Sequence, residues 1–163
     1  MREVPRLSTM SEERARAALD DLGIEYAVTR HGRVGSLAEA AEARGVEPRD
    51  IVKTLVVRRA EDDYVLVLVP GDREISWPKL RAHLGVSRLS MPDAALAKDA
   101  TGYERGTITP FGATHTWPVI ADVSIMGRSV SMGAGGHGVA VTVSADEMLA
   151  ALEAETADVT DPA

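Results

Sequence analysis

The sequence predicts one α+β domain built on a mixed or partly closed β-sheet that is surrounded by helices. Three observations support this fold class. The chain has 163 residues, 45% of them hydrophobic, which suits one domain with a single core. Helix-like and strand-like segments follow one another without the regular strand–helix–strand alternation of a doubly wound fold. No internal repeat or low-complexity segment divides the chain.

The N-terminal third predicts two helices around one strand. Apolar residues recur with helical spacing over residues 11–22, and Gly23 is typical of a helix end. Residues 24–29 are expected to be extended. The segment Ser36-Leu37-Ala38-Glu39 has the pattern of a capping box, so a short helix is expected from there to Gly45.

The middle of the chain predicts a hairpin followed by two short helices. Residues 51–58 and 64–70 are rich in β-branched side chains and are joined by a polar link. We expect helices to begin at Trp77-Pro78 and at Ser90-Met91-Pro92. Proline is common in the first turn of a helix, because its missing backbone N–H costs nothing there. The second of these helices is expected to run towards Thr101.

The last third predicts two strands, a closing helix and a tail. Residues 119–125 and 139–143 have strand patterns, and Ser144 with Glu147 forms a second capping box. Residues 154–163 are acidic and are expected to be flexible. The domain is therefore predicted to cover residues 1–153.

The net charge of −7 argues against nucleic-acid binding, but its distribution weakens that argument. Residues 144–163 carry six acids and no lysine or arginine, whereas basic residues exceed acidic ones between Arg44 and Arg88. This pattern is compatible with a modest basic face and equally with an ordinary solvated surface.

The composition also limits the chemistry and the cellular location. No cysteine is present, so disulfides, thiolate metal sites and a cysteine nucleophile are excluded. The histidines show no metal-ligand spacing, and we expect neither a metal nor another cofactor. The apolar runs are too short to span a membrane and residues 1–14 have no signal core, which predicts a cytoplasmic protein without membrane contact.

Lys53 is the first candidate functional residue, because it interrupts the apolar strand IVKTLVV. Period-two alternation places it on one face with Ile51, Leu55 and Val57. An ammonium group on such a face must reach an edge, pair with an acid or line a cavity. We expect its ammonium group to face the loop formed by residues 106–110 across a cleft.

That loop, Gly106-Thr107-Ile108-Thr109-Pro110-Phe111-Gly112, is the second candidate. Glycine permits unusual backbone angles, and Pro110 makes the preceding residue extended. Fixed backbone groups can hold a water or stabilise an oxyanion without a reactive side chain. A tight connection with no catalytic role is the alternative.

The third candidate is the segment Gly133-Ala134-Gly135-Gly136-His137-Gly138, which satisfies G-x-G-x-x-G. A dinucleotide site would need a helix after this motif, but the strand pattern VAVTV follows. A glycine-rich turn that lines a pocket fits better, and a plain hairpin turn is the alternative.

Taken together, IVKTLVV, PGDREISWPKLRAHLG, ATGYERGTITPFG, WPVIAD and GAGGHG resemble the YbaK/EbsC (YbaK/ProX) family of aminoacyl-tRNA editing domains. The similarity covers about residues 24–152. It implies a YbaK-like fold and a Cys-tRNA(Pro) deacylase-like activity, in which a free-standing trans-editing enzyme removes a small mischarged amino acid from tRNA, in many members tRNA-Pro. The implied partner is the 3′ aminoacyl-adenosine end of the mischarged tRNA, and participation of an aminoacyl-tRNA synthetase is left open.

The resemblance also assigns roles to residues. It implies catalytic roles for Lys53, Gly106 and Pro110, with the ribose 2′-hydroxyl assisting so that no protein nucleophile is needed. The implied substrate-binding residues are Thr54, His31, Ser36, Thr109, Phe111, Gly133, Gly135, Gly136 and His137. Ser36 and Ala140 depart from the family pattern, where an aromatic residue and an acid are expected.

Two functional alternatives remain at this point. The chain could be a non-catalytic module that binds the aminoacyl-tRNA acceptor end, or one that binds a free amino acid. The sequence leaves open which amino acid and which tRNA are recognised, and it leaves the oligomeric state open.

Overall fold

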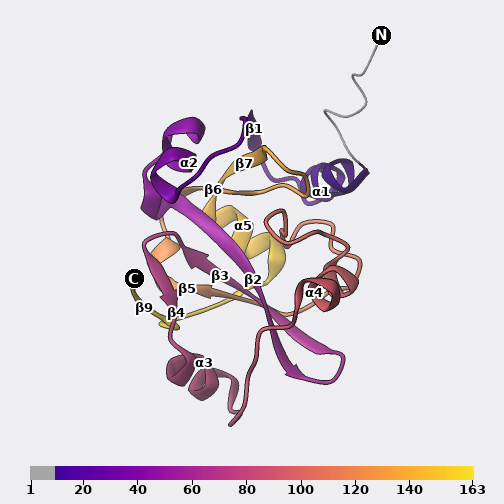
Figure 1. Cartoon of the computed structure of the whole chain (residues 1–163), viewed down its shortest axis with the longest axis vertical. Helices are drawn as coiled ribbons and strands as arrows, with labels where there is room; N and C mark the ends of the chain where they lie inside the picture. Colours follow the sequence, from indigo (N-terminus) through magenta and orange to yellow (C-terminus); the bar gives the residue numbers. More distant parts are fainter. Residues whose placement is uncertain (1–9) are drawn as a thin grey trace.

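A computed structural model describes residues 10–163, and it shows five α-helices around a mixed seven-stranded sheet within that range (Figure 1). The helices are α1 (Met10–Asp21), α2 (Leu37–Arg44), α3 (Trp77–Leu84), α4 (Ala94–Thr101) and α5 (Ala145–Leu152). The strands are β1 (Tyr26–Arg30), β2 (Ile51–Ala60), β3 (Asp63–Pro70), β4 (Arg73–Ile75), β5 (Val119–Asp122), β6 (Ser129–Gly133), β7 (Val139–Ser144), β8 (Glu155–Ala157) and β9 (Thr160–Pro162). Short 3₁₀ turns occupy Pro48–Asp50 and Val123–Ile125.

The strands of the main sheet follow the order β1-β7-β6-β2-β3-β5-β8, and β4 pairs with β9 in a separate ribbon. The β2–β3 hairpin lies at the centre and is antiparallel. Parallel pairs join β6 to β2, β3 to β5 and β5 to β8. The predicted α+β fold with a mixed sheet is therefore confirmed.

Alternation along β2 and β3 supplies two apolar cores, one on each face. Val52 and Val56 belong to the larger core, which also holds residues of α1, α4 and α5. Val57 belongs to the smaller core, where Leu80 of α3 and Val159 are buried. Both faces of the hairpin are covered, which explains its nearly continuous apolar sequence.

Helix boundaries follow the expected capping chemistry. The hydroxyl of Ser36 accepts a hydrogen bond from the N–H of Glu39, and Ser144 accepts one from Glu147 in the same way. Gly45 ends α2 in the left-handed conformation, with φ 72°. Both predicted capping serines are confirmed.

The predicted flexible tail is wrong. Residues 155–157 add β8 to the main sheet, and residues 160–162 pair with β4. Val159 is fully buried between these strands. Asp158 and Asp161 both pair with Lys79 at 3.1 Å, so part of the acidity that suggested a solvated tail serves instead to hold it.

Two other expectations need correction. The strand predicted over residues 119–125 ends at Asp122, because the Asp122 carboxylate caps a 3₁₀ turn there. Strand β6 was not predicted.

The expectation of no signal core concerns residues 1–14, of which residues 1–9 lie outside the described part of the chain. Within residues 10–163, no helix combines the length and the apolar character needed to cross a membrane.

Candidate active site

A gap in the main sheet opens along one edge of β2. On this side β6 pairs only with Ile51 and Val52, through Ser131 and Met132. The edge is covered again at Arg58, whose backbone exchanges hydrogen bonds with Ser90. Within residues 10–163, no strand pairs with the stretch between these two points on that side.

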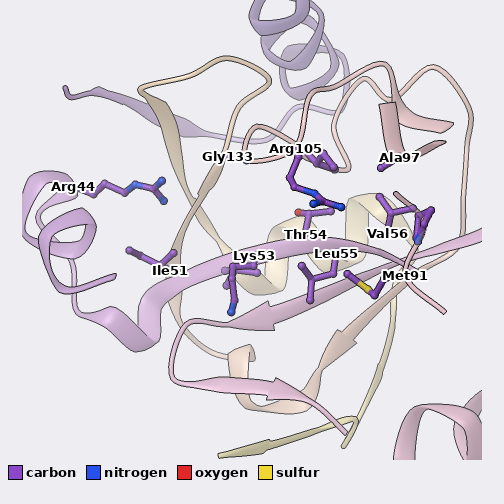
Figure 2. A pocket seen from close by; sticks show the side chains of 14 residues that line it. Arg44, Ile51, Lys53, Thr54, Leu55, Val56, Met91, Ala97, Arg105 and Gly133 are labelled. Carbon is purple, nitrogen blue, oxygen red and sulfur yellow. The ribbon is translucent and has the colours of Figure 1, made fainter. Parts of the chain in front are cut away.

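A pocket of about 230 Å³ occupies this gap (Figure 2). It lies between β2, the end of β6, the segment that follows Ser90 and the loop around Gly106. Its lining residues are Arg44, Ile51, Val52, Lys53, Thr54, Leu55, Val56, Met91, Pro92, Ala97, Arg105, Gly106, Ile108 and Gly133. The floor is therefore apolar, and every ionisable side chain in the lining is basic.

The backbone of β2 presents polar groups to this pocket. In an antiparallel pair, the N–H and C=O of one residue point to the same side, and the side alternates along the strand. Arg58 directs both groups away from β3, towards Ser90. The register from Val52 to Arg58 is regular, so Thr54 and Val56 direct theirs the same way, into the gap. The open edge thus offers two donors and two acceptors.

Thr54 adds a hydroxyl group to this edge. Its side chain is 9% exposed, and its Oγ1 is buried without a hydrogen-bond partner in residues 10–163. An unsatisfied buried hydroxyl costs free energy, and such groups are uncommon in folded proteins. A polar group of a bound substrate would satisfy it.

Lys53 borders the pocket but does not face the loop as expected. Its side chain is exposed, and Figure 2 shows its ammonium group directed away from Thr54 and Arg105. The predicted alternation is correct, since Val57 of the same face packs in the smaller core. The error concerns the loop, which packs on the face of Thr54 rather than on that of Lys53.

The loop at Gly106 reaches the pocket through its first half. Gly106 has φ 91°, a backbone conformation that favours glycine, and it is exposed at the rim. The next residue is fixed, because the Thr107 N–H donates to Glu104 and the Thr107 carbonyl accepts from Gly135. A Cβ at Gly133 would lie 3.3 Å from the Ile108 carbonyl oxygen, so glycine there permits close approach of the loop to β6.

The second half of the loop serves packing. Thr109 and Phe111 are buried, and the Phe111 carbonyl accepts a hydrogen bond from the Tyr103 hydroxyl at 2.5 Å. Pro110 lies between them, outside the pocket lining. The structure therefore assigns Thr109 and Phe111 to the core rather than to substrate contact.

The glycine-rich turn also turns away from the pocket after Gly133. The Gly135 carbonyl accepts from the Ser11 hydroxyl, and a Cβ at Gly135 would lie 2.6 Å from the Ser11 carbonyl oxygen. Gly136 follows, and His137 is exposed at 3.9 Å from Glu104. These residues fix the turn against α1 and do not line the pocket.

The remaining predicted residues lie near α2. Ser36 caps that helix and is exposed. His31 lies behind the pocket lining, where its Nε2 is 3.4 Å from the Nε of Arg44. Ala140 is buried in β7 opposite Gly133. Of the predicted site residues, the structure brings Lys53, Thr54, Gly106 and Gly133 together, and their roles stay predictions.

Sequence reasoning missed two cations of the site. Arg44 is the last residue of α2 and Arg105 precedes Gly106, and both line the pocket. Arginine is frequent in exposed loops and helix ends, so neither position carried a signal. In residues 10–163 no group of three or more histidine and acidic side chains is arranged to hold a metal.

The residues that line this pocket all lie in a part of the chain that matches a known protein family. Residues 31–151 match the family model described as "Aminoacyl-tRNA editing domain", which is well over half of the chain. The chain belongs to this family. The YbaK-like resemblance is thereby confirmed.

Relatives of the editing domain occur in two contexts. The proline–tRNA ligase of Thermosipho africanus is 38% identical over 92 residues, which cover 56% of this chain and only 16% of the ligase. A candidate Cys-tRNA(Pro)/Cys-tRNA(Cys) deacylase, EbsC of Enterococcus faecalis, is 26% identical over 126 residues and 77% of each chain. The structure of a candidate trans-editing enzyme for prolyl tRNA synthetase superposes with a TM-score of 0.84 and 25% identity, over 94% of this chain and 98% of that one.

Proposed function

We propose that this chain is a free-standing deacylase that hydrolyses the ester between a small amino acid and the terminal ribose of a mischarged tRNA. The observation that carries the proposal is the pocket at the open edge of β2, which lies within the matched editing-domain region. It combines an apolar floor, polar backbone groups and basic side chains, as an aminoacyl ester on a nucleic acid requires.

The backbone edge suits both polar ends of the aminoacyl group. N–H groups of Thr54 and Val56 can donate to the ester carbonyl oxygen as negative charge develops on it. Their carbonyl groups can accept hydrogen bonds from the positive α-amino group. The hydroxyl of Thr54 can bind either end, because it both donates and accepts.

Water attack must be assisted by the substrate or by the strand edge. Within the described structure, the lining holds no aspartate, glutamate, histidine, serine or cysteine. Thr54 has no adjacent base that would activate it as a nucleophile. The family resemblance supplies an alternative, in which the ribose 2′-hydroxyl assists. Lys53 borders the pocket with an exposed side chain, and rotation of that side chain towards the ester would let its ammonium group stabilise the developing charge.

The pocket volume supports a small amino acid. Its cavity volume is about 230 Å³. Discrimination in such a pocket is about 1–3 kcal/mol per methylene, so larger side chains are disfavoured by size. The named relatives support tRNA-Pro as the carrier and prolyl-tRNA synthetase as a partner. The translation-related family supports the cytoplasm as the location.

The test is a panel of tRNAs charged with alanine, cysteine, serine, threonine or proline. We expect the chain to release at least one small amino acid and Lys53→Ala to reduce the rate by about 100-fold or more. Lys98→Ala is the matched control, since Lys98 is exposed on α4 outside the pocket lining. Saturable tRNA binding without hydrolysis of any substrate would favour the non-catalytic module instead.

A further inference from the structure

Arg44 reaches the pocket from α2 and is half-buried there. It is the last residue of the helix, and Gly45 turns the chain away immediately after it. Figure 2 shows its guanidinium group extending from α2 towards the centre of the pocket. The side chain is therefore held by secondary structure at the wall of the site.

Neither side chain that hydrogen-bonds to Arg44 carries a negative charge. Its Nε donates to His31 Nε2 and its Nη1 donates to the Ser131 hydroxyl, each at 3.4 Å. His31 Nδ1 lies 2.8 Å from the Gly32 carbonyl, to which an Nδ1–H can donate while Nε2 accepts from Arg44. Two long hydrogen bonds leave the remaining N–H donors available on the pocket side.

Arg44 differs in this respect from Arg59 and Arg73, which are also partly buried. Arg59 pairs with Asp63 at 2.9 Å and Arg73 lies 3.8 Å from Asp122, whereas no carboxylate in residues 10–163 forms an ion pair with Arg44. Burial lowers the pKa of Arg44, because the charged form loses hydration without gaining a counter-charge. An anion that enters the pocket would supply that counter-charge.

We propose that Arg44 binds the phosphodiester group that joins the terminal nucleotide of tRNA to the preceding one. This inference rests on the proposed function, because it assumes that the ester end of tRNA enters the pocket. The ester and the ribose are uncharged and the α-amino group is positive, so this phosphodiester is the anion nearest to the reacting bond. A guanidinium group matches two phosphate oxygens in a bidentate geometry. The carboxylate of a free amino acid offers similar chemistry, and the experiment separates the two.

The experiment measures binding by titration calorimetry with ligands that contain no carboxylic ester. Cytidylyl-(3′→5′)-adenosine carries one phosphodiester, adenosine carries none, and free alanine carries a carboxylate. We expect the native chain to bind the dinucleotide more tightly than adenosine. Arg44→Gln should weaken dinucleotide binding by about 10- to 100-fold and leave adenosine binding unchanged. Arg49→Gln, at an exposed position outside the pocket lining, should change neither.

Three results would overturn the inference: equal native affinities for the two nucleoside ligands, the same loss for both in Arg44→Gln, or Arg44-dependent binding of alanine alone. Because no ligand contains a carboxylic ester, the outcome does not depend on deacylation. Arg44-dependent dinucleotide binding without deacylation would refute the proposed reaction only. Deacylation with Arg44-independent binding would refute the inference only. Melting curves of both variants verify that they fold.

Discussion

Because the hydroxyl of Thr54 is unsatisfied, we predict that its removal raises the stability of the protein and lowers its activity. Thr54→Val keeps the shape of the side chain and replaces the hydroxyl by a methyl group. Mutational data place the cost of an unpaired buried hydroxyl at about 1–3 kcal/mol. Because Thr54 Oγ1 is buried without a partner, we expect the variant to be more stable by about 1 kcal/mol. For a domain of this size that raises the melting temperature by about 2–4 °C.

The same substitution should lower deacylation, because it removes a group that is available to the substrate. A lost hydrogen bond to a charged group corresponds to about a 10-fold or larger decrease in kcat/KM. The assay pairs a calorimetric melting curve with single-turnover deacylation. A lower melting temperature would refute the reasoning, because it would mean that the hydroxyl is satisfied in the folded protein. Unchanged kcat/KM would remove Thr54 from the substrate site.

Thr101→Val provides the matched control. Thr101 is also fully buried, but its hydroxyl donates to the Ala97 carbonyl at 2.8 Å and accepts from the Tyr103 N–H at 3.1 Å. The same chemical change there removes the partner of the Tyr103 N–H and one of the hydrogen bonds to the Ala97 carbonyl, so stability should fall by about 1–3 kcal/mol. Opposite signs for the two threonines would show that the hydrogen-bonding environment, rather than the residue type, determines the effect.

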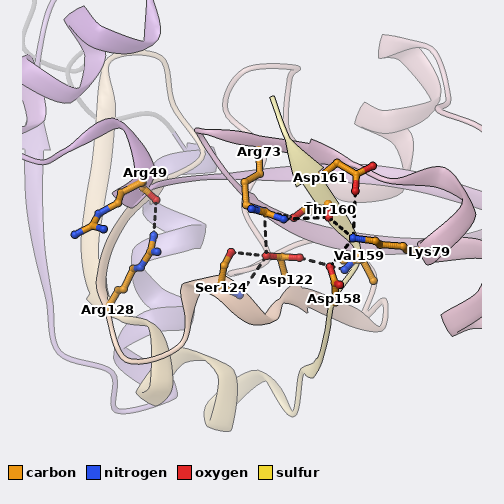
Figure 3. A network of polar contacts seen from close by, with 10 residues as sticks. All are labelled: Arg49, Arg73, Lys79, Asp122, Ser124, Arg128, Asp158, Val159, Thr160 and Asp161. Carbon is orange, nitrogen blue, oxygen red and sulfur yellow. Dashed lines mark hydrogen bonds and ion pairs between the residues drawn. The ribbon is translucent and has the colours of Figure 1, made fainter.

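Two further predictions concern the C-terminal strands and the network around Asp122 (Figure 3). Burial raises the pKa of Asp122, but hydrogen bonds from Ser124, Thr160 and the Val159 N–H outweigh it, so the pKa is lowered. Its stabilisation is therefore present above about pH 4 and is lost as the pH falls through the folded-state value. Asp122→Asn should cost about 1–3 kcal/mol at pH 7 and progressively less as the pH falls below about 4 in urea unfolding, and a pH-independent difference would contradict this. Val159→Ala should cost about 2 kcal/mol, because it truncates a fully buried side chain, and an unchanged unfolding midpoint would mean that the segment between β8 and β9 does not contribute to the stability of the fold.

Local patterns predicted most helices and the central hairpin, and tertiary pairing decided the rest. The hairpin and the capped helices carry strong period and capping signals, so their boundaries were close. Strand β6 has the sequence SVSMG, whose serines and glycine are typical of loops. It is a strand because β7 and β2 both pair with it. The tail was missed for a similar reason, since the partners of β8 and β9 lie far away in the sequence.

The candidate site was likewise predictable from local sequence patterns only in part. Alternation placed Lys53 and Thr54 on opposite faces of β2, which the structure bears out. Which face the Gly106 loop would cover depends on packing between distant segments, and no local pattern encodes it. The gap between β6 and Ser90, which exposes the strand edge, is likewise a property of the whole sheet. Arg44 became a candidate only from the structure, because the sequence does not show that this side chain lacks a carboxylate partner in the described part of the chain.

The charge distribution indicates recognition at short range. The chain carries a net charge of −7, so a tRNA approaching from afar meets overall repulsion rather than attraction. At physiological ionic strength, however, charges are screened beyond about 8 Å. Within that distance of the pocket wall, the substrate meets Arg44, Lys53 and Arg105 and no acidic lining residue. Burial also protects the interaction of Arg44 from screening better than that of an exposed cation. An acidic protein can thus bind the end of a nucleic acid, provided that its cations are concentrated where the phosphates arrive.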